Sequence, residues 1–202
     1  MSDLRQRFYI EDFPVRGEVV HLEEALKTIL AQRDYMPAVQ ILLGEMLSAT
    51  ALLASTLKIK GRISLQIQAN GSFKWAMAEC NHLGEVRALA DYETDPRFGE
   101  ATDSSTVLAA LVNPVLFINI EPEHGERYQG IVPLDQANLA GCLMQYYDLS
   151  AQIPTRIVLA STAQRSGGLL IQLLPRHDEE EQKLVDEDLW PRLTMLTETL
   201  KS

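Results

Sequence analysis

Residues 62–80 read RISLQIQANGSFKWAMAEC, and the first half of this stretch alternates strictly between apolar and polar side chains. Ile63, Leu65 and Ile67 are separated by polar residues, which is typical of a β-strand with one buried face. The pair Asn70-Gly71 follows, and this dipeptide favours a two-residue hairpin turn. The stretch therefore predicts two antiparallel strands.

The second half of the stretch predicts the returning strand. Alternation places one group of its side chains, Phe73, Trp75 and Met77, on one face and a smaller group, Ala76, Ala78 and Cys80, on the other. A further turn at residues 81–84 leads into a third strand at residues 85–92. Three strands joined by tight turns indicate an antiparallel meander.

Helices are predicted on both sides of this meander in the sequence. Residues 22–32 carry a helical apolar stripe, and Pro37 stands where a first helical position favours it. The helix that follows is apolar almost all round, so we expect it to be buried. Further along, we expect a short helix at 106–112, an amphipathic helix at 135–147, and hairpins at 115–132 and 155–174. Strands and helices are grouped rather than alternating, which predicts an α+β fold of antiparallel sheets packed on the long helix.

The charge balance excludes several kinds of partner. The chain carries 18 Lys and Arg against 28 Asp and Glu, a formal net charge of −10. An acidic chain repels nucleic acid and anionic membrane surfaces, so we expect neither as a partner. The longest apolar run, residues 38–57, is interrupted by polar side chains and predicts no membrane helix. With no signal-peptide core and only two cysteines, we expect a cytoplasmic protein.

The acidity is concentrated in residues 178–188, which hold seven carboxylates and one lysine. This shift predicts a core domain of residues 1–177 followed by an acidic linker of residues 178–202, although a solvated acidic loop explains the same run. Pro191 can begin a final helix. On that helix one apolar stripe is predicted, formed by Leu189, Leu193, Leu196 and Leu200.

Patterns for metal or nucleotide chemistry are missing from the sequence. The only close ligand pair is Cys80-x-His82, whereas zinc needs three or four convergent ligands, so no metal site is predicted. We expect Cys80 and Cys142 to be small buried side chains, because neither has a neighbouring base that would activate a thiolate. The glycine pair Gly167-Gly168 lies in a predicted hairpin turn and not between a strand and a helix, so it predicts no phosphate site.

One dense group of titratable residues keeps an enzymatic alternative open. It consists of Glu121, Glu123, His124 and Glu126, in a predicted hairpin loop. Carboxylates beside a histidine can perform acid–base catalysis. A small acid–base enzyme using this cluster, or a thiol enzyme using Cys142, is therefore the alternative to a non-enzymatic function.

Several blocks of sequence resemble those of one family. In the second half of the chain they are residues 126–132 (ERYQGIV), 139–143 (LAGCL), 146–147 (YY) and 150–156 (SAQIPTR). Near the two ends they are residues 15–18 (VRGE), 167–175 (GGLLIQLLP) and 193–199 (LTMLTET). In this order they resemble the heat-shock protein 33 family of redox-regulated chaperones, over essentially the whole chain.

The resemblance implies a function and also a departure from the family. It implies an ATP-independent holdase that binds unfolding proteins, as a homodimer, in the bacterial cytoplasm. The family also carries a Cys-x-Cys…Cys-x-x-Cys module, which binds zinc when reduced and forms two disulfides under oxidative stress. No such cysteines follow Cys142 here. We therefore expect these residues to be the substrate-binding core and the beginning of the linker, as a fragment or truncated form, without zinc or the redox switch.

The residues themselves agree with a binding protein. The lack of a nucleotide motif fits an ATP-independent binder, and an amphipathic helix on an acidic tether fits a removable cover. The candidate client-binding residues are Leu65, Ile67, Phe73, Trp75 and Met77. The same side chains could instead fill the core beneath the long helix, since large exposed apolar patches are rare unless functional. A third interpretation is a dimeric scaffold whose apolar face contacts only its twin.

Overall fold

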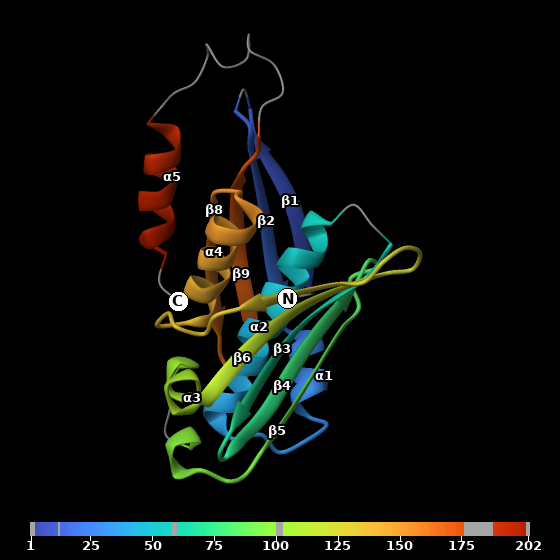
Figure 1. Ribbon diagram of the computed structural model, residues 1–202, viewed down its shortest axis with the longest axis vertical. Coiled ribbons are helices and arrows are strands. Elements are labelled where there is room, and N and C mark those ends of the chain that lie inside the picture. Colours follow the sequence, from blue (N-terminus) through green and yellow to red (C-terminus); the bar gives the residue numbers. More distant parts are fainter. Residues whose placement is uncertain (1–2, 12, 58–59, 100–102, 176–187, 201–202) are drawn as a thin grey trace.

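The computed structural model describes residues 3–11, 13–57, 60–99, 103–175 and 188–200. Their strands form two antiparallel sheets, with the order β1-β2-β9-β8 in one and β5-β4-β3-β6-β7 in the other (Figure 1). Helices pack against both sheets, so the predicted α+β class is confirmed. The predicted domain boundary between residues 177 and 178 lies outside the described residues.

The five-stranded sheet contains the predicted meander. Its strands are β3 (Gly61–Asn70), β4 (Phe73–Asn81) and β5 (Val86–Tyr92), and Gly71 has a φ of +91° in the first turn, a conformation that glycine adopts without strain. β6 (Val112–Pro122) pairs with the other edge of β3, and β7 (Tyr128–Val132) pairs with β6. The hairpin expected at residues 115–132 therefore extends the meander into a five-stranded sheet.

One prediction about β4 is wrong. Phe73 does not share a face with Trp75 and Met77, because the β4–β5 register shifts between Phe73 and Trp75. Phe73 lies opposite Tyr92 and Trp75 lies opposite Asp91, so Lys74 is an extra residue, as in a β-bulge. The bulge turns Phe73 to the buried face of the sheet, where its ring contacts the rings of Tyr92 and Phe98.

The four-stranded sheet combines two strands from the beginning of the chain with two strands from its second half. It consists of β1 (Leu4–Ile10), β2 (Val15–Leu22), β8 (Thr155–Ser161) and β9 (Ser166–Leu173). The central pairing is β2 with β9, in which Val15 lies opposite Leu173 and Leu22 lies opposite Ser166. The last hairpin is confirmed, but Gly167 and Gly168, which are predicted to lie in its turn, belong to strand β9, because pairing with β8 already begins at Ser166.

The helix α2 (Pro37–Thr56) lies between the two sheets and contacts β2, β3, β4, β5, β8 and β9. Most of its side chains are buried, including Leu42, Leu43, Met46, Leu47 and Leu52, as its all-round apolar sequence predicts. Among the described residues, α2 is the one helix long and apolar enough to cross a membrane, and 72% of that window is buried inside the protein. The apolar composition of α2 is therefore that of a core helix, because both sheets pack against it.

Shorter helices complete the structure. These are α1 (Glu24–Leu30), α3 (Ser105–Ala110), α4 (Leu139–Tyr146) and α5 (Leu189–Glu198), with a 3-10 turn at Pro96–Phe98 and a π-helical turn at Tyr147–Ala151. α4 begins later than predicted because Asn138 caps it, accepting a hydrogen bond from the Gly141 N–H at 2.8 Å. Cys142 and Leu143 of α4 join the core, whereas α5 lies at the side of the molecule, in contact with β8 (Figure 1).

Candidate functional site

The four-stranded sheet has one face toward α2 and one face away from it. The even-numbered residues of β9 face α2: Ser166 forms a 3.0 Å hydrogen bond with Ser48, and Gly168 lies against Leu52. Successive strand residues point to opposite faces, so the odd-numbered residues of β9 point away from the helix. We call this far side the four-stranded outer face. Its apolar members with exposed surface are Leu4, Phe8, Ile10, Val19, Val158, Ala160, Leu169 and Leu173, whereas Val15 and Ile171 lie on the same side but are buried.

The strand registers arrange this face in rows. Val19 lies opposite Leu169, which lies opposite Val158, and all three side chains are partly exposed. In the next row Gly17 lies opposite Phe8 on one side and Ile171 on the other. Polar side chains end both rows, because Gln6 of β1 lies opposite Val19 and Arg156 of β8 lies opposite Ile171. The result is an apolar patch centred on Val19, Leu169 and Val158, and exposed apolar patches are characteristic of interaction sites.

Gly17 has a specific role in this surface. A Cβ atom built on Gly17 would fall inside the Phe8 ring, so the ring lies directly over the glycine of the neighbouring strand. This arrangement covers the strand backbone and lays the aromatic ring flat on the sheet. Gly17 therefore shapes the four-stranded outer face without contributing a side chain to it.

The helix α5 lies beside this face. The guanidinium carbon of Arg156, on β8, lies 5.4 Å from the centre of the Trp190 ring, a cation–π distance. Leu193 and Thr194 are partly buried on the same side of α5, and Thr197 is buried. Positions 190, 193, 194 and 197 follow helical spacing, so they form the docked side of α5.

The predicted stripe on α5 is only partly the docked side. Leu189 and Leu193 are partly buried, but Leu196 is 61% exposed. Leu200, also predicted on this helix, lies beyond its end at Glu198 and is 50% exposed. The helix is rotated relative to the prediction because Trp190, and not the leucine stripe, packs on Arg156. α5 therefore presents Leu196 to solvent, while Trp190 contacts Arg156 of β8.

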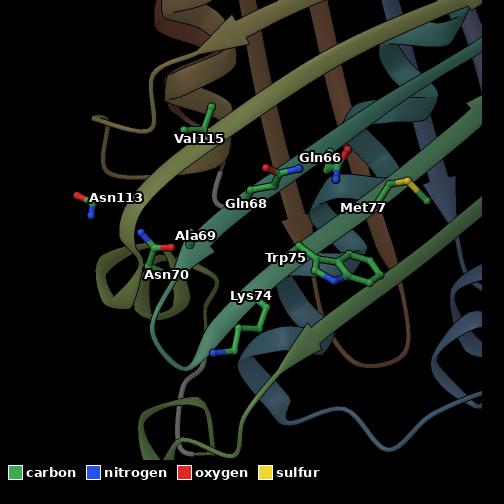
Figure 2. A pocket seen from close by; sticks show the side chains of 9 residues that line it. All are labelled: Gln66, Gln68, Ala69, Asn70, Lys74, Trp75, Met77, Asn113 and Val115. Carbon is green, nitrogen blue, oxygen red and sulfur yellow. The ribbon is translucent and has the colours of Figure 1, made fainter.

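The predicted client-binding residues are divided between two environments. Leu65, Ile67 and Phe73 are fully buried in the core around α2, which is the competing interpretation of the alternating pattern. Trp75 and Met77 are partly exposed on the opposite side of the five-stranded sheet. There they line a cavity of about 480 Å³ with Gln66 and Gln68 of β3 (Figure 2). The three core residues are therefore no longer candidates for client contact.

Two carboxylates of the cluster around the β6–β7 turn, Glu121 and Glu123, form surface ion pairs. Glu121 is within 2.5 Å of Arg62 and 3.7 Å of Arg127, and Glu123 is 3.8 Å from His82. The hydrogen bond from Arg62 lowers the pKa of Glu121 below its usual value, which favours the ionised form. A general acid needs the opposite shift, so this geometry does not support acid–base catalysis.

The two cysteines are buried on different elements, Cys80 at the end of β4 and Cys142 in α4. Burial raises the pKa of the Cys80 thiol to about 11 and also raises the pKa of Cys142. A raised pKa leaves the thiol protonated and unreactive at neutral pH, which does not support a thiol enzyme. Within the described ranges, no three His, Cys, Asp or Glu side chains are grouped to hold a metal ion.

Comparison with known proteins identifies the family. The family model described as "Hsp33 protein" matches residues 3–202. The chain belongs to the Hsp33 family. A "33 kDa chaperonin" of Ectopseudomonas mendocina is 42% identical over 200 residues, covering 99% of this chain and 66% of that protein. One from a Shewanella species is 36% identical over 201 residues, again covering 66% of the relative.

The fold of the Hsp33 family is also matched by a solved structure. The 33 kDa chaperonin (heat shock protein 33 homologue) of Thermotoga maritima superimposes with a TM-score of 0.80 at 21% identity, over 97% of this chain and 67% of that chain. The present chain spans just under two thirds of the length of the curated Hsp33 relatives that it matches. The four-stranded outer face was missed at the sequence level, although the apolar run Leu169-Leu170-Ile171 indicates a strand buried or apolar on both faces.

Proposed function

We propose that this chain is the client-binding part of an ATP-independent holdase chaperone. The observation that supports the proposal most directly is the four-stranded outer face, an apolar surface on the side of a sheet away from the core helix. Unfolded chains expose apolar side chains, and burial of apolar area is a non-directional driving force that tolerates many client sequences. The relatives are named as chaperonins, which agrees with the predicted non-enzymatic function.

The partners of the chain are part of the same proposal. Unfolded proteins are the proposed clients, a homodimer is the proposed assembly, and the bacterial cytoplasm is the proposed location. We propose that residues 1–202 act without a bound cofactor, in agreement with the buried and unreactive state of Cys80 and Cys142. Trp75 and Met77 are a second proposed client contact, because both are partly exposed beside a cavity.

One experiment tests this function and separates the two surfaces. A client protein is aggregated by heat without nucleotide, and light scattering is recorded with and without the chain. We expect suppression by the unmodified chain, because its apolar surface competes with client–client contacts. We expect severalfold weaker suppression by the double variant Val19→Asn/Leu169→Asn, whose side chains lie opposite each other on the four-stranded outer face. The variant Trp75→Ser/Met77→Ser tests the second surface in the same assay.

A matched control is available at the β4–β5 turn. Leu83 is 70% exposed there, so Leu83→Ser also removes an exposed apolar side chain but alters neither surface. It should leave suppression unchanged. Equal loss in the control, or no loss in either double variant, would contradict the assignment of these surfaces. Absence of suppression by the unmodified chain, together with a dimeric mass, would support the dimeric scaffold instead.

A further inference from the structure

The core helix α2 contains one ionisable side chain, Glu45, and it is only 9% exposed. Its Oε2 atom accepts a hydrogen bond from the Ser104 hydroxyl at 2.5 Å. Ser104 is itself buried and immediately precedes α3, the six-residue helix Ser105–Ala110. The contact therefore joins the middle of the core helix to the beginning of a short peripheral helix.

The surroundings of Glu45 disfavour a negative charge. The carboxyl lines a cavity of about 560 Å³, which is shared with charged or titratable groups from three other segments: His21 of β2, Asp103 before α3, and Arg165 before β9. Hydrogen bonds from Ser105 lower the pKa of Asp103, so Asp103 is negative at neutral pH and repels a second carboxylate. The His21 Nε2 atom lies 3.7 Å from the Oε2 atom of Glu23.

Burial dominates the balance at this site. Loss of water raises the pKa of Glu45 to about 7, the Ser104 hydrogen bond opposes this rise, and the charge of Asp103 adds to it. Moving Ser104 and Asp103 away from α2 would hydrate the carboxyl and relieve the repulsion. A helix as short as α3 has little stability of its own, so its position depends on contacts of this kind.

We propose that ionisation of Glu45 releases residues 103–110 from the core helix, so that the Glu45–Ser104 contact acts as a proton-controlled latch. Protonated Glu45 keeps α3 docked, with Val107 of α3 fully buried. Ionised Glu45 favours an open state, in which Val107 adds apolar surface to the molecule. This inference does not rest on the proposed chaperone function, because it concerns only the docking of one helix.

The size of the effect follows from linkage. A carboxyl that titrates at about 7 when closed and at its ordinary value of 4.5 when open changes the opening equilibrium about tenfold between pH 6 and pH 8. The sign is toward opening as the pH rises, because the closed state holds the proton more tightly.

Hydrogen exchange of residues 103–110 tests the latch on the whole 202-residue chain. Mass spectrometry is performed at pH 6 and pH 8, and the rates are corrected for the intrinsic pH dependence of amide exchange. We expect the protection of these residues in the unmodified chain to fall about tenfold from pH 6 to pH 8. In Glu45→Gln, which keeps an acceptor for Ser104 and cannot ionise, protection should stay constant. Glu45→Met, of similar size and also uncharged, provides a second variant if the first does not fold.

The variant His21→Asn removes the imidazole that shares the cavity with Glu45. It should retain the tenfold fall if Glu45 controls the latch. The proposal is overturned if the unmodified chain shows no fall, if Glu45→Gln shows the same fall, or if His21→Asn abolishes it.

Discussion

The substitution Gly17→Ala is expected to destabilise the protein through one aromatic ring. The methyl group would occupy the position of the Phe8 ring, so the ring must leave the sheet. Full burial of a phenylalanine side chain stabilises by about 1.5–3 kcal/mol. Since Phe8 is only partly buried, we expect a loss of about 1–2 kcal/mol, which corresponds to a fall of about 2–8 °C in the unfolding temperature of a chain of this length.

A double-mutant cycle isolates this effect. In a Phe8→Ala background the added methyl group meets no ring, and replacing a strand glycine by alanine should then be neutral or stabilising by about 0.5 kcal/mol. Urea unfolding of the four proteins, followed by circular dichroism, measures the coupling. Gly99→Ala serves as the control, because its added Cβ would make only ordinary contacts, the nearest at 3.4 Å from the Pro96 carbonyl oxygen. An equal cost of Gly17→Ala with and without the ring would refute the reasoning.

Three further outcomes are expected. Because Glu45 binds its proton more tightly in the folded state, the unmodified chain should lose about 2.5 kcal/mol of stability relative to Glu45→Gln between pH 5 and pH 8, measured by urea unfolding at both pH values. We expect the unmodified chain to suppress client aggregation equally in dithiothreitol and in peroxide. The double variant Cys80→Ser/Cys142→Ser should behave in the same way. A redox response of the unmodified chain that disappears in the variant would contradict this expectation. Trp190→Ala should remove about 1 kcal/mol of cation–π contact and accelerate hydrogen exchange in α5 about fivefold, whereas unchanged exchange would show that Arg156 does not hold the helix.

The fold could be predicted largely because its signals are local. Alternation at Ile63, Leu65 and Ile67 and the Asn70-Gly71 turn specify a hairpin without reference to the rest of the chain. The side of the sheet on which Phe73 lies could not be predicted, because the bulge at Lys74 depends on the pairing with β5. A shift of one residue reverses the faces of a strand, so the bulge places Phe73 on the face opposite to that of Trp75 and Met77.

The candidate site was harder to predict because it depends on pairings between distant segments. Val19, Leu169 and Val158 become one surface only through the β2–β9 and β8–β9 registers, and no local pattern specifies these registers. The docked side of α5 was missed for a similar reason. A leucine stripe is visible in the sequence, but the stacking of Trp190 on Arg156 requires knowledge of where β8 lies.

The pairing of β2 with β9 has a consequence for how the molecule folds. Val15 pairs with Leu173, and about three quarters of the chain lies between them, whereas the pairings among β3, β4 and β5 join strands that are close in sequence. Closing so large a loop costs conformational entropy before the contacts between the two strands form and stabilise the pairing. Topologies of high contact order therefore fold slowly. During synthesis at about 5–20 residues per second, β1 and β2 wait about 8–30 s for β9 to leave the ribosome. The nascent N-terminal hairpin therefore carries an unpartnered strand edge for that time, and is itself exposed to the aggregation that chaperones prevent.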